Sequence, residues 1–248
     1  MSKAGWLLPQ FLELERALWS RYPVWQHALR TGELFAPSPI DFAKIGTPPF
    51  DRGIAAVLNV VRQFSGEEYP DRDTLADLSI WLLWSLGHPA FAETPSKLPV
   101  ETIELADLEP WISNPADYLG HLLTQYGRAN RTTAFFPTFQ PCADLMVRFA
   151  TQVTIAHSEL VPPYHGYDPA LGTGRLALSA SNVCRSLSGW ELNRSLLTLA
   201  LLNFTLFAPD FAYPLCSAGD LILGDSLTGE GRSLVQSSRR YASWAVQL

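Results

Sequence analysis

The pattern of apolar and polar positions changes character near residue 130. Before that point, apolar residues recur at helical spacing and predict helices over residues 9–30, 51–64, 71–86 and 115–126. Pro23 is expected to break the first of these into two pieces. Prolines predict a loop over residues 35–50 and an acidic link over residues 90–110, and Asp51 and Asp71 or Asp73 are expected to cap helix starts. The pattern therefore predicts a helical domain over residues 1–130.

After residue 130, helical stretches alternate with short strand-like ones. The expected order is a helix after Pro141, a strand ending near 168, a helix over 175–187, a strand end at 189–191, a helix over 195–207, and strands at 220–223 and 242–248. Strands that alternate with helices predict a parallel sheet with right-handed crossovers. Residues 131–248 are therefore predicted to form an α/β domain.

A glycine-rich turn follows the first predicted strand. It runs from Asp168 through Pro169, Gly172, Thr173 and Gly174 to a helix at Arg175. Glycine can adopt backbone angles that bring a ligand close, and the start of the next helix offers unpaired N–H groups. Glu191 lies 23 residues after Asp168, near the end of the second strand, where a carboxylate can accept hydrogen bonds from ribose hydroxyls. This order is typical of a nucleotide-type cofactor site.

Charge is distributed unevenly along the chain, whose formal net charge is −6. Residues 1–130 hold 10 basic and 16 acidic side chains, whereas residues 131–248 hold 8 of each. Because non-specific DNA affinity is mostly electrostatic, the acidic half is a poor DNA-binding surface by itself. The arginines that could contact DNA are Arg128, Arg131, Arg175, Arg239 and Arg240.

The three cysteines and the apolar runs bear on whether the protein binds a metal, is secreted or enters a membrane. Cys142, Cys184 and Cys216 share no ligand-like spacing, so free buried thiols in a cytoplasmic protein and no metal site are expected. The most apolar run, Leu196–Phe207, is too short to span a bilayer, and no secretory signal is recognisable. The sequence predicts no membrane partner.

Four stretches of the second half together carry a family resemblance. They are Phe136 with Thr138, Asp168–Gly174, Gly189 with Glu191 and Asn193, and Gly224-Asp225-Ser226-Leu227. In this order they resemble the adenine-N6 DNA methyltransferases that use S-adenosylmethionine, in particular the modification subunits of type I restriction systems. The resemblance covers residues 131–227. It implies an N-terminal helical domain followed by a Rossmann-like sheet of the methyltransferase type, incomplete in this chain.

The resemblance also implies roles for individual residues. The loop with Phe136 and Thr138 would contact the methionine end of S-adenosylmethionine. Asp168, Pro169, Gly172, Thr173 and Gly174 would hold the amino-acid part of the cofactor and line its ribose. Glu191 would bind the ribose hydroxyls, and Asp225 would meet the amino group of the adenine.

The sequence departs from the family pattern at three places. Leu171 replaces a small cysteine and is expected to add bulk beside the cofactor, and Phe139 replaces a proline. The Asn-Pro-Pro-aromatic tetrapeptide that holds the flipped adenine is not found after the strand predicted at 242–248. No catalytic residue is therefore assigned, and the chain is expected to be truncated. Val161-Pro162-Pro163-Tyr164 is a poor substitute, because valine cannot accept a hydrogen bond from the target amine.

Other cofactor and enzyme classes fit less well. Ser226 within Gly-Asp-Ser-Leu resembles one group of serine hydrolases, but no histidine follows His165. The glycine turn lacks the third glycine of the dinucleotide-binding fingerprint.

Three functional hypotheses remain open from the sequence. The chain is the S-adenosylmethionine-binding portion of a DNA methyltransferase that needs a second chain for methyl transfer, or a non-catalytic family member that acts as a binding module. A relic without present activity is the third. DNA, a second methyltransferase chain, or a second copy paired through the C-terminal strand edge are the expected partners.

Overall fold

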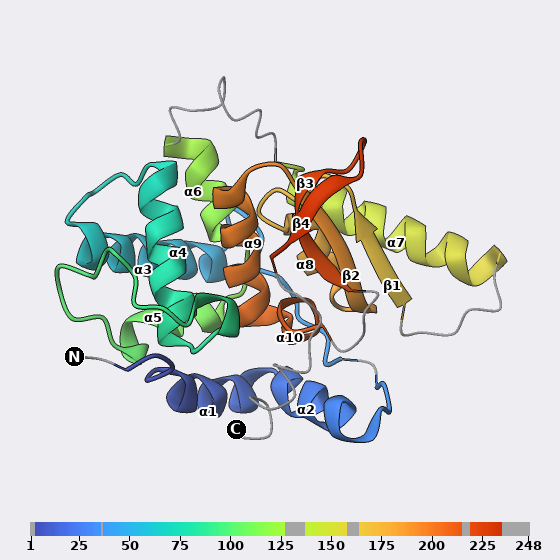
Figure 1. Ribbon diagram of the computed structural model, residues 1–248, viewed down its shortest axis with the longest axis horizontal. Helices are drawn as coiled ribbons and strands as arrows, with labels where there is room; N and C mark the ends of the chain where they lie inside the picture. Colours follow the sequence, from blue (N-terminus) through green and yellow to red (C-terminus); the bar gives the residue numbers. More distant parts are fainter. Residues whose placement is uncertain (1–2, 36, 127–136, 158–163, 215–218, 235–248) are drawn as a thin grey trace. The chain divides into compact units, whose positions relative to one another are not determined.

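The computed structural model describes residues 3–35, 37–126, 137–157, 164–214 and 219–234, without the side chains of 153–157. The chain groups into two compact units (Figure 1). Unit 1 contains Met1–Trp19 and Ile40–Phe136, and unit 2 contains Ser20–Pro39 and Pro137–Leu248. The units divide after Phe136, and the domain boundary at residue 130 stays a prediction. The segment Ser20–Pro39, however, groups with the C-terminal unit.

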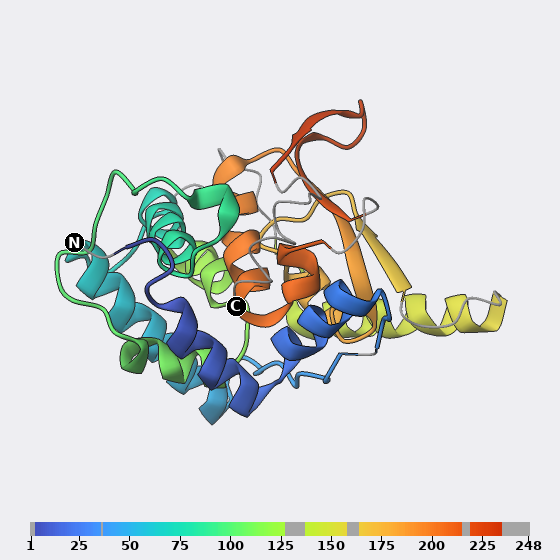
Figure 2. The same ribbon diagram turned by 60° about the horizontal axis from the view of Figure 1, so that its bottom comes forward.

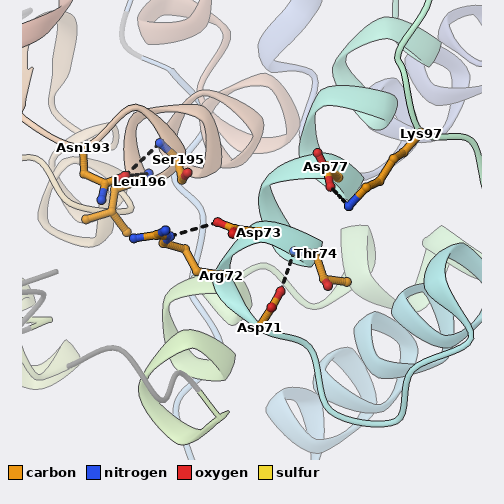
Figure 3. Close-up of polar contacts among 9 residues, drawn as sticks. All are labelled: Asp71, Arg72, Asp73, Thr74, Asp77, Lys97, Asn193, Ser195 and Leu196. Atoms are coloured by element: carbon orange, nitrogen blue, oxygen red, sulfur yellow. Dashed lines mark hydrogen bonds and ion pairs between the residues drawn. The ribbon is translucent and has the colours of Figure 1, made fainter. Parts of the chain in front are cut away.

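All regular secondary structure in the described residues of unit 1 is helical. Its helices are α1 (Leu8–Leu18), α3 (Pro48–Ser65), α4 (Arg72–Ser85), the 3-10 turn η1 (Pro89–Phe91), α5 (Leu105–Ser113) and α6 (Tyr118–Tyr126). Asp71 caps α4 as predicted, because its carboxylate accepts a hydrogen bond from Thr74 N at 2.7 Å (Figure 3). Asp51 does not cap α3, which begins after Thr47, so Asp51 lies in the first turn instead.

Helix α5 is a structural difference from the sequence pattern. Its first residues fall within the segment expected to be an acidic link, and Pro110 lies inside the helix. A capping box explains why the helix starts there: Glu104 N donates to Asp107 Oδ2 at 2.9 Å, and the Glu104 side chain accepts from the backbone of Asp107. Helix α5 packs against α3 and α1, and thus completes the core of the unit.

Unit 2 is built on a four-stranded sheet. The strands are β1 (Tyr164–Asp168), β2 (Cys184–Glu191), β3 (Asp220–Asp225) and β4 (Glu230–Ser233), in the spatial order β1-β2-β3-β4. The pairs β1–β2 and β2–β3 are parallel, as predicted, and β4 pairs antiparallel with β3. The α/β class with a Rossmann-like, mostly parallel sheet is therefore confirmed. The β3–β4 hairpin was not predicted.

The helices of unit 2 are α2 (Arg21–Thr31), α7 (Gln140–His157), α8 (Arg175–Ala180), α9 (Arg194–Phe207) and the short α10 (Pro209–Ala212). Helices α8, α9 and α10 pack against the strands, α7 packs against α8, and α2 packs against α10 (Figure 2). The apolar face of the sheet, with Leu187 and Leu221, is buried. Helix α9 is buried along its length from Leu196, which explains why its sequence is apolar on all sides.

Further predictions about unit 2 can be compared with the structure where it describes the residues concerned. The helix expected over 175–187 ends at Ala180, because residues from Cys184 onward pair with β1 and become β2. Cys184 is buried, as expected, whereas Cys142 is exposed on α7. The strand expected at 242–248, with the edge it was to provide, lies outside the described residues. Within the described ranges, every helix is too short or too polar to cross a bilayer.

Candidate functional site

The candidate site lies where the parallel strands β1 and β2 end. Asp168 is the last residue of β1 and Glu191 the last of β2, and Asp168 pairs in register with Gly189. Because the two strands are parallel, their carboxyl ends lie at the same edge of the sheet. In open α/β sheets this edge is where ligands bind.

The turn after β1 is fixed to the end of β2 by hydrogen bonds. Leu171 N donates to Trp190 O at 2.8 Å, and Gly172 N donates to Glu191 Oε2 at 2.8 Å. The other carboxylate oxygen, Glu191 Oε1, accepts from Asn193 N at 2.8 Å. Glu191 thus joins the turn after β1 to the turn after β2. Since a carboxylate has about four acceptor positions, two hydrogen bonds leave it able to accept more.

Asp168 is the most buried carboxylate of this edge, with 8% of its surface exposed. Its Oδ1 accepts from Ala170 N at 3.1 Å, which shapes the start of the glycine turn. Burial raises the pKa of Asp168, and the hydrogen bond from Ala170 opposes that shift. A desolvated carboxylate of this kind favours a ligand that brings a positive charge or an N–H donor.

The glycines of the turn have backbone and packing roles. Gly172 and Gly174 both have positive φ, 57° and 81°, which side-chain-bearing residues rarely adopt. A Cβ on Gly174 would also lie 2.7 Å from the ring of Phe204 in α9. Gly174 is therefore required for helix packing, in addition to any approach of a ligand. Thr173 is buried, and its carbonyl accepts from Asn203 Nδ2 at 2.9 Å.

Leu171 does not add bulk beside the site, which corrects the expectation from the sequence. Its side chain is only 4% exposed and packs into the interior. A Cβ on Gly189 would lie 2.9 Å from Leu171 Cδ2, so the absence of a side chain at Gly189 makes room for the leucine. The large side chain of Leu171 thus occupies the space that Gly189, which has no side chain, leaves open at β2.

The segment before α7 is attached to the glycine turn through Arg175. Arg175 Nη1 donates to Thr138 O at 3.0 Å, and Thr138 is partly buried. Phe139 is 61% exposed, and Phe136 lies outside the described residues. Of the arginines considered for DNA contact, Arg175 is the one that the described ranges include. The structure thus brings Thr138, Asp168 and Glu191 to one region of unit 2.

Asp225 lies farther along the same edge. Glu191 pairs in register with Leu223, so Asp225 follows two residues later at the end of β3, with its side chain on the same face. Asp225 Oδ1 accepts from Leu227 N at 2.8 Å, which forms the turn into β4. The Gly-Asp-Ser-Leu stretch therefore ends β3 and begins the hairpin turn.

A pocket of about 280 Å³ adjoins Asp168. Its walls come from α7, α8 and the first two strands, and include Met146, Val147, Leu176 and Leu187. Asp168 contributes the carboxylate of this mostly apolar lining. Ligand sites commonly combine apolar walls with a few polar groups. Among the described residues, no cluster of three or more His, Cys, Asp or Glu is placed to hold a metal ion.

Two residues of this region make contacts that the sequence did not indicate. Asn193 links Glu191 to α9, because its side chain accepts from Ser195 N and Leu196 N at 2.9 and 3.3 Å (Figure 3). Arg175 begins α8, where acidic residues are usually favoured. An arginine at this unfavourable position is the feature of the sequence that could have indicated a hydrogen-bond partner outside α8.

Comparisons with known proteins give limited likeness. No model of a known protein family matches the chain, and no curated protein matches it. A candidate class I S-adenosylmethionine-dependent methyltransferase from Listeria monocytogenes is similar over 64% of this chain and 50% of its own, with 13% identity and a TM-score of 0.36. The methyltransferase subunit of a type I restriction-modification system from Streptococcus thermophilus is similar over 62% of this chain and 36% of its own, with 20% identity and a TM-score of 0.30. The chain therefore spans half or less of the length of these two proteins.

Proposed function

We propose that unit 2 binds S-adenosylmethionine at the carboxyl edge of its sheet. The observation that carries this proposal is the arrangement of Asp168 and Glu191 around the glycine turn, with a pocket beside Asp168. The cofactor carries an ammonium group, two ribose hydroxyls and an amino group on its adenine. Each of these needs an acceptor, and this edge provides three carboxylates in Asp168, Glu191 and Asp225.

The groups of the ligand can be assigned to the residues by chemistry. The ammonium and the aliphatic arm suit the apolar pocket that ends at Asp168. The ribose hydroxyls suit Glu191, whose two oxygens are already oriented by Gly172 N and Asn193 N. Asp225 would accept from the adenine amino group. When bound, the cofactor would supply an electrophilic methyl group, and the residues named here bind and orient it.

We extend this proposal to methyl transfer to adenine N6 in DNA. A second chain would supply the groups that hold the base. One feature of unit 2 supports the addition of a partner. In the sheet formed by the described residues, β1 is an edge strand. The side of β1 that faces away from β2 can therefore pair with a further strand. The alternative is a non-catalytic module that uses the same edge for protein contacts.

Calorimetry with S-adenosylmethionine tests the cofactor proposal. The unmodified chain is expected to bind, and Asp168→Asn and Glu191→Gln are each expected to weaken binding by about tenfold, the loss of one charge-assisted hydrogen bond. Asp220→Asn is a matched control, because burial also raises the pKa of Asp220 but this residue begins β3 at the opposite end of the sheet. No binding at millimolar cofactor would sink the proposal, and methyl transfer by the isolated chain would remove the need for a second chain.

A further inference from the structure

Helix α7 carries an apolar stripe on the side that faces solvent. The stripe consists of Cys142, Leu145, Met146 and Phe149, which are all exposed, the last three by 53%, 53% and 58%. Because a helix turns by about 100° per residue, these four positions fall within about 100° of its circumference. Arg148 is also exposed but lies outside this arc. A surface helix usually turns such a stripe toward the core, so the stripe of α7 marks a contact surface.

The opposite side of α7 is packed against α8. Ala143 is fully buried, Gln140 Nε2 donates to Ser179 Oγ at 2.9 Å, and Ser179 Oγ donates to Asp144 Oδ1 at 2.7 Å. In the described residues α8 is the main neighbour of α7, and α7 extends past β1 at the outer side of unit 2 (Figures 1 and 2). These contacts lie on the side of α7 opposite the stripe.

The exposed area of the stripe suits a weak dimer of this chain. A large apolar side chain that is about half exposed offers on the order of 100 Å². With Phe139, which directly precedes α7 and is 61% exposed, the stripe and its flanking residues present roughly 500 Å² in each copy. Two copies would together bury roughly 1,000 Å², the lower end of the range for specific interfaces. The area therefore supports a dimer that depends on concentration.

The sizes of the side chains along the stripe favour an antiparallel, symmetric pair of α7 helices. With the two-fold axis between residues 145 and 146, Cys142 of each copy faces Phe149 of the other. In the middle, the two Leu145 side chains face each other on one flank, and the two Met146 side chains on the other. Each layer then has a similar volume. A parallel pair would oppose Phe149 to Phe149 and Cys142 to Cys142, which overfills one layer and leaves a gap in the other.

We propose that two copies of this chain pair through the stripe of α7, antiparallel and around a two-fold axis. The proposal does not depend on cofactor binding, because it rests on the exposed side of α7 alone. It does bear on the candidate site, since Met146 belongs to the stripe and also lines the pocket beside Asp168. In the dimer, the second copy covers this side of the pocket.

The test uses opposite charges at Leu145, the residue that faces its own copy. Leu145→Glu and Leu145→Lys each place two like charges against each other in the dimer. Leu227→Glu is the matched control, because Leu227 is 95% exposed and lies after β3, away from α7. Sedimentation equilibrium of the full chain measures the mass of each protein and of an equimolar mixture of the two Leu145 variants. Circular dichroism confirms that each variant is folded.

The unmodified chain and Leu227→Glu are expected to be dimers at about 100 μM, with a dissociation constant on the order of 10 μM. Each Leu145 variant alone should raise this constant by at least about tenfold, because like charges face each other. The equimolar mixture should recover the dimer, because glutamate then faces lysine.

Three results overturn the proposal. The first is an unmodified chain that remains monomeric at about 100 μM. The second is a dimer that persists in both Leu145 variants, which would show pairing through another surface such as a sheet edge. The third is an equimolar mixture that stays monomeric although both variants are folded, since Leu145 then does not face its own copy.

Discussion

Two polar clusters of unit 2 differ in the partners of their charged side chains, which are backbone N–H groups in one cluster and oppositely charged side chains in the other. The open cluster is Asp168, Glu191 and the glycine turn at the carboxyl edge of the sheet, where the carboxylates accept from neutral backbone N–H groups. The closed cluster is Arg21, Arg185 and Asp210, all at least 95% buried. Arg185 Nη2 lies 2.8 Å from Asp210 Oδ1.

The difference shows which cluster can serve a ligand. In the closed cluster, opposite charges neutralise each other, and Arg21 is held by Ser181 Oγ, Phe207 O and Ser38 O at 2.8 to 2.9 Å. In the open cluster, no basic side chain among the described residues pairs with Asp168 or Glu191, and Glu191 keeps part of its acceptor capacity. A ligand with donors therefore has acceptors at the open cluster, whereas the closed cluster stabilises the fold. Variants of the two clusters should separate stability from ligand binding.

The largest effect is expected for Asp210→Ala. Removal of this carboxylate leaves the Arg185 guanidinium buried without its partner, and its Nε and Nη1 have no acceptor among the described residues. Above the raised pKa of Asp210, where its carboxyl is ionised, removing one partner of this buried ion pair costs about 3–5 kcal/mol in the free energy of unfolding. Urea unfolding followed by circular dichroism measures the loss.

Asp220→Ala is the control for this prediction, because its hydrogen-bond partner is the neutral Ser233 hydroxyl. It should cost about 1 kcal/mol. A loss below about 1 kcal/mol for Asp210→Ala would mean that the two clusters do not differ in the way described. Cofactor affinity should be unchanged for the folded Asp210→Ala protein.

The second effect is a dependence of stability on pH that comes from the closed cluster. Burial raises the pKa of Asp210 to about 7, against the opposing attraction of Arg185 and Arg21. In the unfolded chain this carboxyl loses its proton near pH 4. Between these values the folded state binds more protons, so the free energy of unfolding falls as pH rises, by an amount on the order of a few kcal/mol.

Asp210→Asn should remove most of this slope, because the amide does not titrate. Burial also raises the pKa of Asp168 and Asp220, which contribute in the same direction, so a smaller slope should remain. Urea unfolding at intervals from pH 4 to pH 8 gives both curves. Parallel curves for the two proteins would contradict a raised pKa at Asp210.

Local sequence patterns predicted the open cluster better than the closed one. Asp168, the glycine turn and Glu191 follow strand ends, and a turn after a strand has a composition that can be recognised from a few neighbouring residues. Arg185 and Asp210 are 25 residues apart and meet only because α10 packs on β2. No short window of sequence contains that pairing.

The errors in secondary structure have the same cause. Residues 184–187 were expected to continue a helix, but their pairing with β1 in the sheet outweighs their local helical spacing. The expected bulk of Leu171 beside the ligand was also wrong, because its matching space at Gly189 comes from another strand. Contacts between distant parts of the chain decided each case.

The third effect concerns Leu171 and Gly189, whose packing against each other holds the glycine turn of the open cluster on β2. Leu171→Ala should destabilise the protein by about 3 kcal/mol through a cavity. Gly189→Ala should cost about 1–3 kcal/mol, because the new Cβ would lie 2.9 Å from Leu171 Cδ2. Urea unfolding of the double variant should show a loss smaller than the sum of the two, since alanine at 189 partly fills the cavity. Additive losses would show that the two side chains do not share one space.

The smallest effect is expected for Asn193→Ala, and it sharpens the comparison most directly. Asn193 caps α9 with its side chain, while its backbone N–H donates to Glu191 Oε1. Asp71→Ala in unit 1 is the matched control, because Asp71 caps α4 but has no role in the proposed site. Each substitution should lower the free energy of unfolding by about 1 kcal/mol.

Only Asn193→Ala should also weaken S-adenosylmethionine, by about threefold, a cost of about 0.7 kcal/mol. The reason is that a loosened start of α9 lets the Asn193 N–H move, and Glu191 then loses one of the two donors that orient its carboxylate. Calorimetry on both variants separates the outcomes. If the two caps cost equal stability and neither changes affinity, the orientation of Glu191 comes from Gly172 N alone, and the open cluster is anchored by the glycine turn rather than by both turns.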